Sequence, residues 1–188
     1  LSLFIYLRQA TTVFTPERVI PPELEPLDEF IGGCINQVAR DGINILGGNG
    51  GFIRFPEDID TESGASLSYN PLFPSIKVPL WHYRGSTRIP SEEYMEQDIA
   101  YYIDQNLDEC LNNLEQFRNQ YDIIEIAPRD IVVKLSEESV DITLDYPIEV
   151  ISKVEEQKTK IDDFRTKVPY RLKKVYELAK RIMEEELR

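Results

Sequence analysis

Two cysteines are the residues with the clearest chemical potential in this chain. Cys34 and Cys110 each lie on the apolar stripe of a predicted helix. If the two helices pack together, the thiols can form a disulfide, which needs Cα atoms about 4.4–6.8 Å apart. The bond would close a loop of about 77 residues and stabilise the fold by about 4.5 kcal/mol in the chain-entropy model. An even cysteine count fits an oxidising compartment, whereas the alternative is two buried free thiols.

The one histidine, His82, does not complete a catalytic or zinc site with these cysteines. A Cys–His nucleophile needs an imidazole beside a thiolate, and thiolates are disfavoured on apolar stripes. His82 lies in a strand-like segment whose alternation is typical of a surface or edge position. One histidine and two distant cysteines also fall short of an ordinary zinc site.

The loop with Asp58, Asp60 and Glu62 has the oxygen-rich alternation of a calcium site. It departs from the EF-hand pattern, because Ser63 occupies the sixth position and Tyr69 the twelfth. A solvated acidic loop is the favoured interpretation.

The glycine-rich segment Gly47–Gly51 follows a predicted helix and is typical of a helix end and turn. It precedes a strand and lacks a following Gly-Lys-Ser/Thr, so it does not match a phosphate-binding loop. We therefore predict no catalytic residue, no cofactor and no metal site.

The charge of the chain excludes one class of partner. Its 188 residues include 34 Asp or Glu and 21 Lys or Arg, which gives a net charge of −13. This acidic balance argues against nucleic acid and against an electrostatic attraction to anionic lipids. The 41% of hydrophobic residues is enough for a sizeable core.

The periodicities predict an α+β fold, with two or three helices packed on one face of an antiparallel β-meander. Helices are expected over 23–46, from Ser91 to about Asn119, and over 170–188. Strands are expected over 52–55, 76–83, 123–126, 130–135, 140–144 and 148–151, with a turn at Tyr146-Pro147 and a short strand or turn within 153–167. Gly32 and Gly33 weaken the first helix, so we expect close packing there.

Both termini of the sequence suggest longer elements. Residues 1–8 (Leu-Ser-Leu-Phe-Ile-Tyr-Leu-Arg) are typical of the end of an N-terminal membrane anchor, with a short buried strand as the alternative. Residues 9–24 are expected to be an extended linker and 25–167 an extracytoplasmic domain. The last helix, 168–188, begins basic and ends with Glu184–Glu186, against the macrodipole preference. We expect this helix to continue beyond the chain.

The order of these features resembles a group of uncharacterised archaeal surface proteins. The residues that carry the resemblance are Leu3–Leu7 as an anchor remnant, Cys34, the segments 47–53 and 106–117, and Leu144–Pro147. Such proteins have a short N-terminal hydrophobic anchor, sometimes with a pilin-type signal, and an extracytoplasmic α+β domain. Unlike archaeal pilins, which usually continue the N-terminal helix into an all-β head, this chain has early prolines and a mixed body.

The leading hypothesis is a non-enzymatic, membrane-anchored protein of the cell envelope with a structural or protein-interaction role. Its expected location is the cell surface, on the extracytoplasmic side of the membrane. Its expected partners are other envelope proteins or copies of itself, and the membrane through the N-terminal segment, but not nucleic acid. The alternatives are a subunit of a surface filament or sheath, and a hydrolase that uses acidic residues or a metal at Asp58, Asp60 and Glu62.

Overall fold

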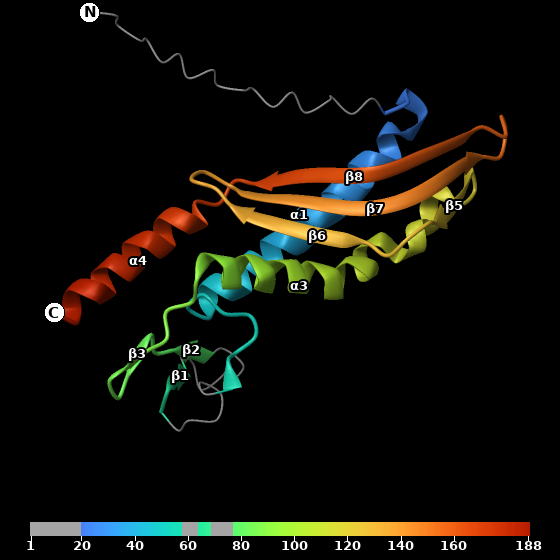
Figure 1. The fold of residues 1–188 in the computed structure, drawn as a ribbon. Coiled ribbons are helices and arrows are strands. Elements are labelled where there is room, and N and C mark those ends of the chain that lie inside the picture. Colours follow the sequence, from blue (N-terminus) through green and yellow to red (C-terminus); the bar gives the residue numbers. More distant parts are fainter. Residues whose placement is uncertain (1–19, 58–63, 69–76) are drawn as a thin grey trace, which may run out of the picture.

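The computed structural model describes residues 20–57, 64–68 and 77–188 (Figure 1). The helices of the described part are η1 (Pro22–Leu24), α1 (Glu25–Gly48), α3 (Glu92–Leu111), η2 (Asn112–Phe117) and α4 (Leu172–Glu186), of which η1 and η2 are 3-10 segments. The strands are β1 (Ser66–Ser68), β2 (Lys77–Pro79), β3 (His82–Tyr83), β4 (Ser86–Thr87), β5 (Tyr121–Glu125), β6 (Asp130–Leu135), β7 (Val140–Ser152) and β8 (Lys158–Val168). The predicted α+β class is confirmed.

The long strand β7 is the centre of the main sheet. One of its edges pairs with β8, and the other edge pairs with β6 along residues 140–145 and with β5 along residues 148–152, all antiparallel. The segments predicted as two strands, 140–144 and 148–151, are thus one strand. The turn predicted at Tyr146-Pro147 is instead a register shift between Asp145 and Ile148. Pro147 has no N–H to donate, and an irregularity of this kind tolerates that loss.

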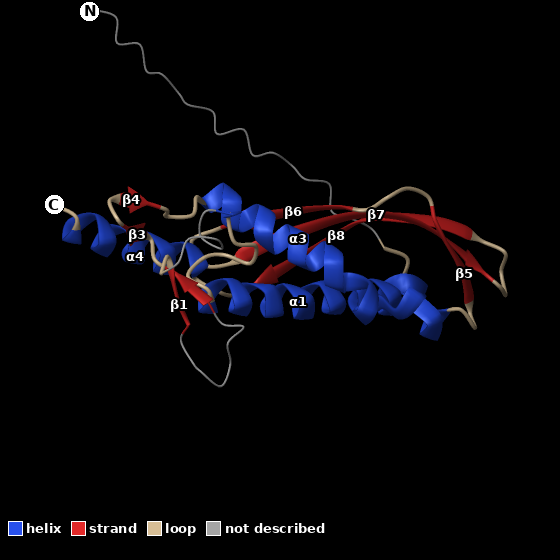
Figure 2. Cartoon of the chain, turned by 90° about the horizontal axis from the view of Figure 1, so that it is seen from below, coloured by secondary structure: helices blue, strands red, loops and turns tan. Residues whose placement is uncertain are grey.

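Helices α1 and α3 cover one face of this sheet (Figures 1 and 2). Helix α1 lies against β8, α3 lies against β6, and the two helices pack on each other. Burial alternates along β7, because successive side chains point to opposite faces. The buried face of the sheet supplies Ile142, Leu144, Ile148 and Val150 to the core, and the helices supply residues such as Ile35 and Ile103.

Helix α1 begins and ends close to the predicted positions, but its tight packing occurs at a different glycine. Nothing would lie within 4 Å of a Cβ atom at Gly32 or Gly33, so the close contact expected there is wrong. A Cβ atom at Gly42 would lie 2.8 Å from Cδ1 of Tyr102 on α3. The absence of a side chain at Gly42 therefore lets α1 and α3 approach each other.

Helix α3 begins as predicted and ends earlier. The Ser91 Oγ accepts a hydrogen bond from the backbone N–H of Tyr94 at 3.1 Å, which caps the first turn. The helix ends at Leu111 rather than near Asn119, because Asn112, Asn113 and Leu114 all have positive φ angles. Three consecutive left-handed residues cannot continue a right-handed helix.

The segment predicted as a strand over 52–55 is a loop that a buried carboxylate holds in place. Asp98 of α3 is fully buried. Its Oδ2 accepts hydrogen bonds from the backbone N–H groups of Ile53 at 2.8 Å and Arg54 at 3.1 Å, and its Oδ1 accepts one from Arg54 Nε at 2.7 Å. Because Asp98 binds these N–H groups, the loop does not need a partner strand.

Replacing this carboxylate should destabilise the protein strongly. We expect Asp98→Ala to lower the free energy of unfolding by about 2–4 kcal/mol, because two backbone N–H groups lose their acceptor inside the protein. Urea unfolding followed by circular dichroism measures this change. The control is Glu109→Ala at an exposed position of α3, which should alter stability by less than about 0.5 kcal/mol. Equal effects of the two substitutions would contradict the role given to Asp98.

A second carboxylate stabilises the turn between β6 and β7. Asp141 accepts hydrogen bonds from the Ser136 hydroxyl at 2.5 Å and the Ser139 hydroxyl at 2.9 Å, and Lys167 Nζ lies 3.8 Å away. These hydroxyl donors and the lysine charge lower the pKa of Asp141 below its ordinary value of 3.8, although partial burial acts in the opposite direction.

The lowered pKa predicts a contribution to stability that depends on pH. Because the folded pKa lies below the unfolded one, the contribution is fully present above about pH 4 and is lost as the pH falls through the folded pKa. Side-chain carbon NMR can follow the Asp141 carboxyl from pH 6 to pH 2. We expect Ser136→Ala with Ser139→Ala to move this pKa upward, and an unchanged pKa would refute the explanation.

Candidate functional site

The two cysteines form a disulfide that joins α1 to α3. The Cα atoms of Cys34 and Cys110 are 5.6 Å apart, and 76 positions separate them in sequence. Cys34 is buried and Cys110 is half-buried at the end of α3 nearer η2. The structure thus places both predicted residues together, and neither cysteine remains as a thiol. The bond is therefore a cross-link between the two helices that cover the sheet.

His82 lies away from this bond, on the short β3–β4 hairpin. Its Nδ1 is 3.2 Å from the Thr87 hydroxyl, and its side chain is half-exposed. Because both cysteines are bonded to each other, His82 has no thiolate to activate.

The acidic loop with Asp58, Asp60 and Glu62 lies outside the described residues. Within the ranges that the structure describes, no group of three or more His, Cys, Asp or Glu side chains could hold a metal ion. The glycine segment ends α1 and turns the chain, and Gly50 and Gly51 both have positive φ angles, as a turn requires.

An ion-pair cluster that sequence reasoning did not find attaches the β5–β6 connection to α3. The Arg129 guanidinium donates to Asp104 Oδ1 at 3.0 Å, to the backbone carbonyl of Asp104 at 2.6 Å, and to both carboxylate oxygens of Asp108. The acids are four residues apart and so lie on one face of α3. Arg129 stands alone in a loop, so nothing in the local pattern indicated this contact.

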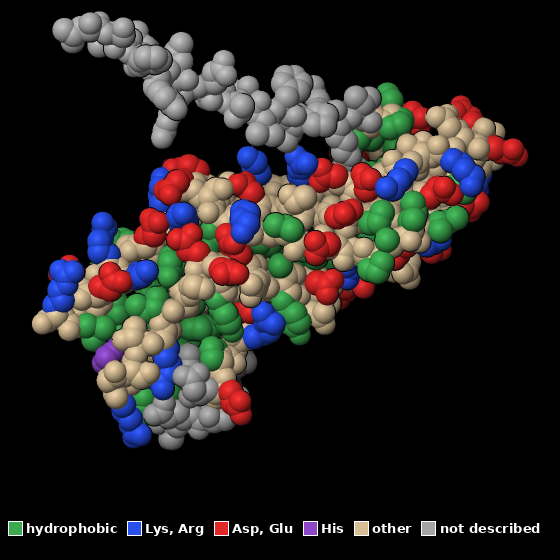
Figure 3. All heavy atoms as spheres, viewed as in Figure 1, with side chains coloured by type: hydrophobic (Ala, Val, Ile, Leu, Met, Phe, Trp, Pro, Cys, Tyr) green, Lys and Arg blue, Asp and Glu red, His purple; other side chains and the backbone are tan. Residues whose placement is uncertain are grey.

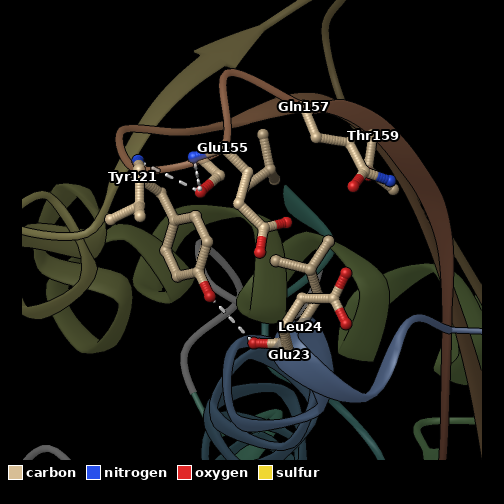
Figure 4. A pocket seen from close by; sticks show the side chains of 9 residues that line it. Glu23, Leu24, Tyr121, Glu155, Gln157 and Thr159 are labelled. Carbon is tan, nitrogen blue, oxygen red and sulfur yellow. Dashed lines mark hydrogen bonds between the residues drawn. The ribbon is translucent and has the colours of Figure 1, made fainter.

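A hollow of about 300 Å³ lies where the start of α1 meets the β7–β8 hairpin (Figure 4). Tyr121 and Glu155 reach from the sheet toward Glu23 and Leu24, and the Tyr121 hydroxyl donates to the Glu23 carbonyl at 2.9 Å. Leu24 and Val150 give the hollow an apolar base, and two carboxylates lie among its lining residues. The sequence could not indicate the hollow, because segments more than 90 residues apart form it.

A row of exposed apolar side chains lies along α4. The side chains of Val175, Leu178 and Ile182 are 64%, 50% and 53% exposed. Tyr176 is the buried residue of this helix: its ring packs edge-on against Trp81, and its hydroxyl donates to the Pro90 carbonyl at 2.7 Å. The sequence predicted a helix over 170–188, but it did not predict that these apolar side chains would face outward.

A groove of about 400 Å³ adjoins this stripe. It runs between α4 and the segment that includes β2, and its lining is mostly apolar: Gly50, Val78, Pro79, Leu80, Trp81, Ala179, Ile182, Met183 and Glu186. Figure 3 shows hydrophobic side chains gathered between α4 and the β1–β4 region. The stripe and the groove form one continuous apolar surface through Ile182.

In the part of the chain that the structure describes, none of the helices is both long and apolar enough to cross a bilayer. The expected anchor remnant, residues 1–8, lies outside that part. Comparisons with protein-family models, with curated proteins and with solved structures found no match.

Breaking the disulfide should lower stability by an amount that the loop length determines. For a separation of 76 positions, the chain-entropy model gives about 4.5 kcal/mol. We expect Cys34→Ala with Cys110→Ala, and reduction of the wild-type protein, to lower the free energy of unfolding by similar amounts. Urea unfolding with and without dithiothreitol measures both. If dithiothreitol shifted the unfolding of the double variant as well, the effect would not come from this bond.

Proposed function

We propose that this chain is a non-enzymatic, membrane-anchored protein of the cell envelope, with its α+β body on the extracytoplasmic side and a role in structure or protein contact. The observation that carries the proposal is the Cys34–Cys110 disulfide. Disulfides between core elements persist in oxidising compartments and are rare in the cytosol.

The position of the bond supports this location. Cys34 lies in the buried interface between α1 and α3, so reductants reach the sulfur atoms with difficulty while the protein is folded. A cross-link over so long a loop also adds stability against unfolding, which suits a protein outside the reach of cytosolic chaperones.

The exposed surfaces support a contact role. The outward face of the main sheet carries charges of both signs with some hydrophobic side chains among them (Figure 3), and such a surface is compatible with solvent and with polar partners. The stripe on α4 adds an apolar surface of a kind that marks interaction sites. Copies of the chain itself and other envelope proteins are the partners that we propose.

The arrangement of the ends fits an anchor before the body. Helix α1 begins at one end of the molecule, whereas α4 and the β1–β4 region lie at the other end (Figure 1). An anchor in the segment before Ile20 would thus hold the first end at the membrane and leave α4 on the distal side.

The location can be tested in intact cells that produce the full-length protein. Cells are quenched with acid, and the denatured protein is treated with a maleimide polymer before and after reduction. We expect no mass shift before reduction and two additions after it. In parallel, protease added outside intact cells should remove the α4 epitope while a cytosolic marker survives. Two free thiols without reduction, or a protected α4, would overturn the proposed location.

A further inference from the structure

We propose that α4 pairs in antiparallel orientation with α4 of a second copy of this chain. The inference rests on the proposed contact role and names the partner. The surface involved is the stripe of Val175, Leu178 and Ile182, which the described residues leave open. These positions are separated by three and four residues, the spacing that aligns side chains on one face of a helix and suits helix-to-helix packing.

The charges along α4 are complementary to a second copy in one orientation. In the antiparallel alignment that places Val175 opposite Ile182 of the second copy, Arg171 lies opposite Glu186, and both residues share the helix face of the stripe. This pair occurs twice by symmetry. No position in this alignment places like charges opposite each other.

In a parallel pair of α4 helices, like charges would lie beside each other. Each residue would then lie beside its own copy, so the lysines near the start and the three glutamates at residues 184–186 would repel. The helix dipoles would also point the same way, whereas antiparallel dipoles attract.

The same alignment explains the unusual order of charges in this helix. The first turn of α4 contains no acidic residue and its last turn no basic residue, the opposite of what stabilises an isolated helix. Next to an antiparallel neighbour, the basic start of one helix lies beside the acidic end of the other. The order that is unfavourable within one chain becomes favourable between two.

Ion pairs within the chain leave this complementarity in place. Glu138 binds both Arg171 and Lys174, and Glu92 lies 3.2 Å from Lys173. The Arg171 side chain stays 69% exposed beside Glu138, so it remains accessible to Glu186 of a second copy. At the other end, one arginine, Arg188, pairs with one of the three glutamates.

A lipid surface fits the same stripe less well. Helices that lie on membranes carry Lys and Arg on their polar face, but α4 has four basic and four acidic side chains. Anionic headgroups would repel its glutamate-rich end. The mixture of charges therefore favours a copy of the same helix.

Self-association of the full 188-residue chain, kept oxidised, tests the inference by sedimentation velocity over a series of concentrations. We expect a reversible dimer whose dissociation constant rises by about tenfold or more in Ile182→Lys, because a charge replaces a buried contact. The control is Ile124→Lys on β5, an isoleucine of similar exposure, which should leave the constant within about twofold. Circular dichroism confirms that both variants fold.

A charge exchange tests the orientation. Arg171→Glu should weaken the dimer, because a glutamate then opposes Glu186 of the second copy. Adding Glu186→Arg to the same chain should restore it. Restoration is expected of an antiparallel pair alone, since a parallel pair would still oppose like charges.

Three results would overturn the inference without affecting the proposed location, which the thiol and protease experiments test separately. The first is a monomer at all concentrations whose binding to neutral or anionic vesicles is lost in Ile182→Lys, which would assign the stripe to lipid. The second is a monomer that Ile182→Lys destabilises, which would show that another part of the chain covers the stripe. The third is a dimer that Ile124→Lys weakens as much as Ile182→Lys does.

Discussion

The contact between α3 and its neighbours is the interaction on which the rest of the structure depends. Cys110 joins the helix to α1, Asp98 holds the loop after α1, and Asp104 with Asp108 binds the β5–β6 connection through Arg129. Glu96 of the same helix accepts a hydrogen bond from the Leu135 N–H on the open edge of β6. A strand edge with unpaired N–H groups attracts other chains, so this carboxylate both fixes α3 and protects the edge. Each of these contacts joins α3 to a different part of the chain.

The elements that sequence reasoning identified are those whose signal is local. The stripes of α1 and α3 and the cap at Ser91 follow from short-range spacing, and the structure confirms them. The errors have non-local causes. Tyr146-Pro147 was predicted as a turn, but pairing with neighbouring strands on both sides of it keeps it within β7. The charged segment 153–167 gave a weak strand signal, because β8 gains its stability from pairing along the whole of β7. Likewise, close helix packing was expected at Gly32 and Gly33 but occurs at Gly42, where α1 contacts Tyr102 of α3.

The same distinction applies to candidate sites. The disulfide could be predicted because both cysteines lie on the apolar faces of strongly predicted helices. In one small domain, two such helices bury their apolar faces in the same core and so pack close together. The hollow beside Tyr121 and the Arg129 cluster could not, since each depends on the spatial meeting of loops with no pattern of their own. The outward direction of the α4 stripe is a third kind of feature, which the sequence predicts only in part. Periodicity shows that a helix has an apolar face, but only the placement of Tyr176 against Trp81 decides which part of that face the body covers.

The geometry of the molecule gives antiparallel pairing of α4 a further consequence. Helix α4 leaves the sheet at the end of β8 and projects away from it, while α1 begins near the opposite end (Figure 1). In an antiparallel pair the two bodies would extend in opposite directions from the shared helices, because each helix begins at its own body and ends toward the other. The ends at which the two α1 helices begin would then lie at opposite extremes of an elongated dimer. If an anchor precedes Ile20, such a dimer suits contact between chains that are anchored well apart. A helix pairing that is weak in a single dimer would then bind more strongly overall where many anchored copies face one another.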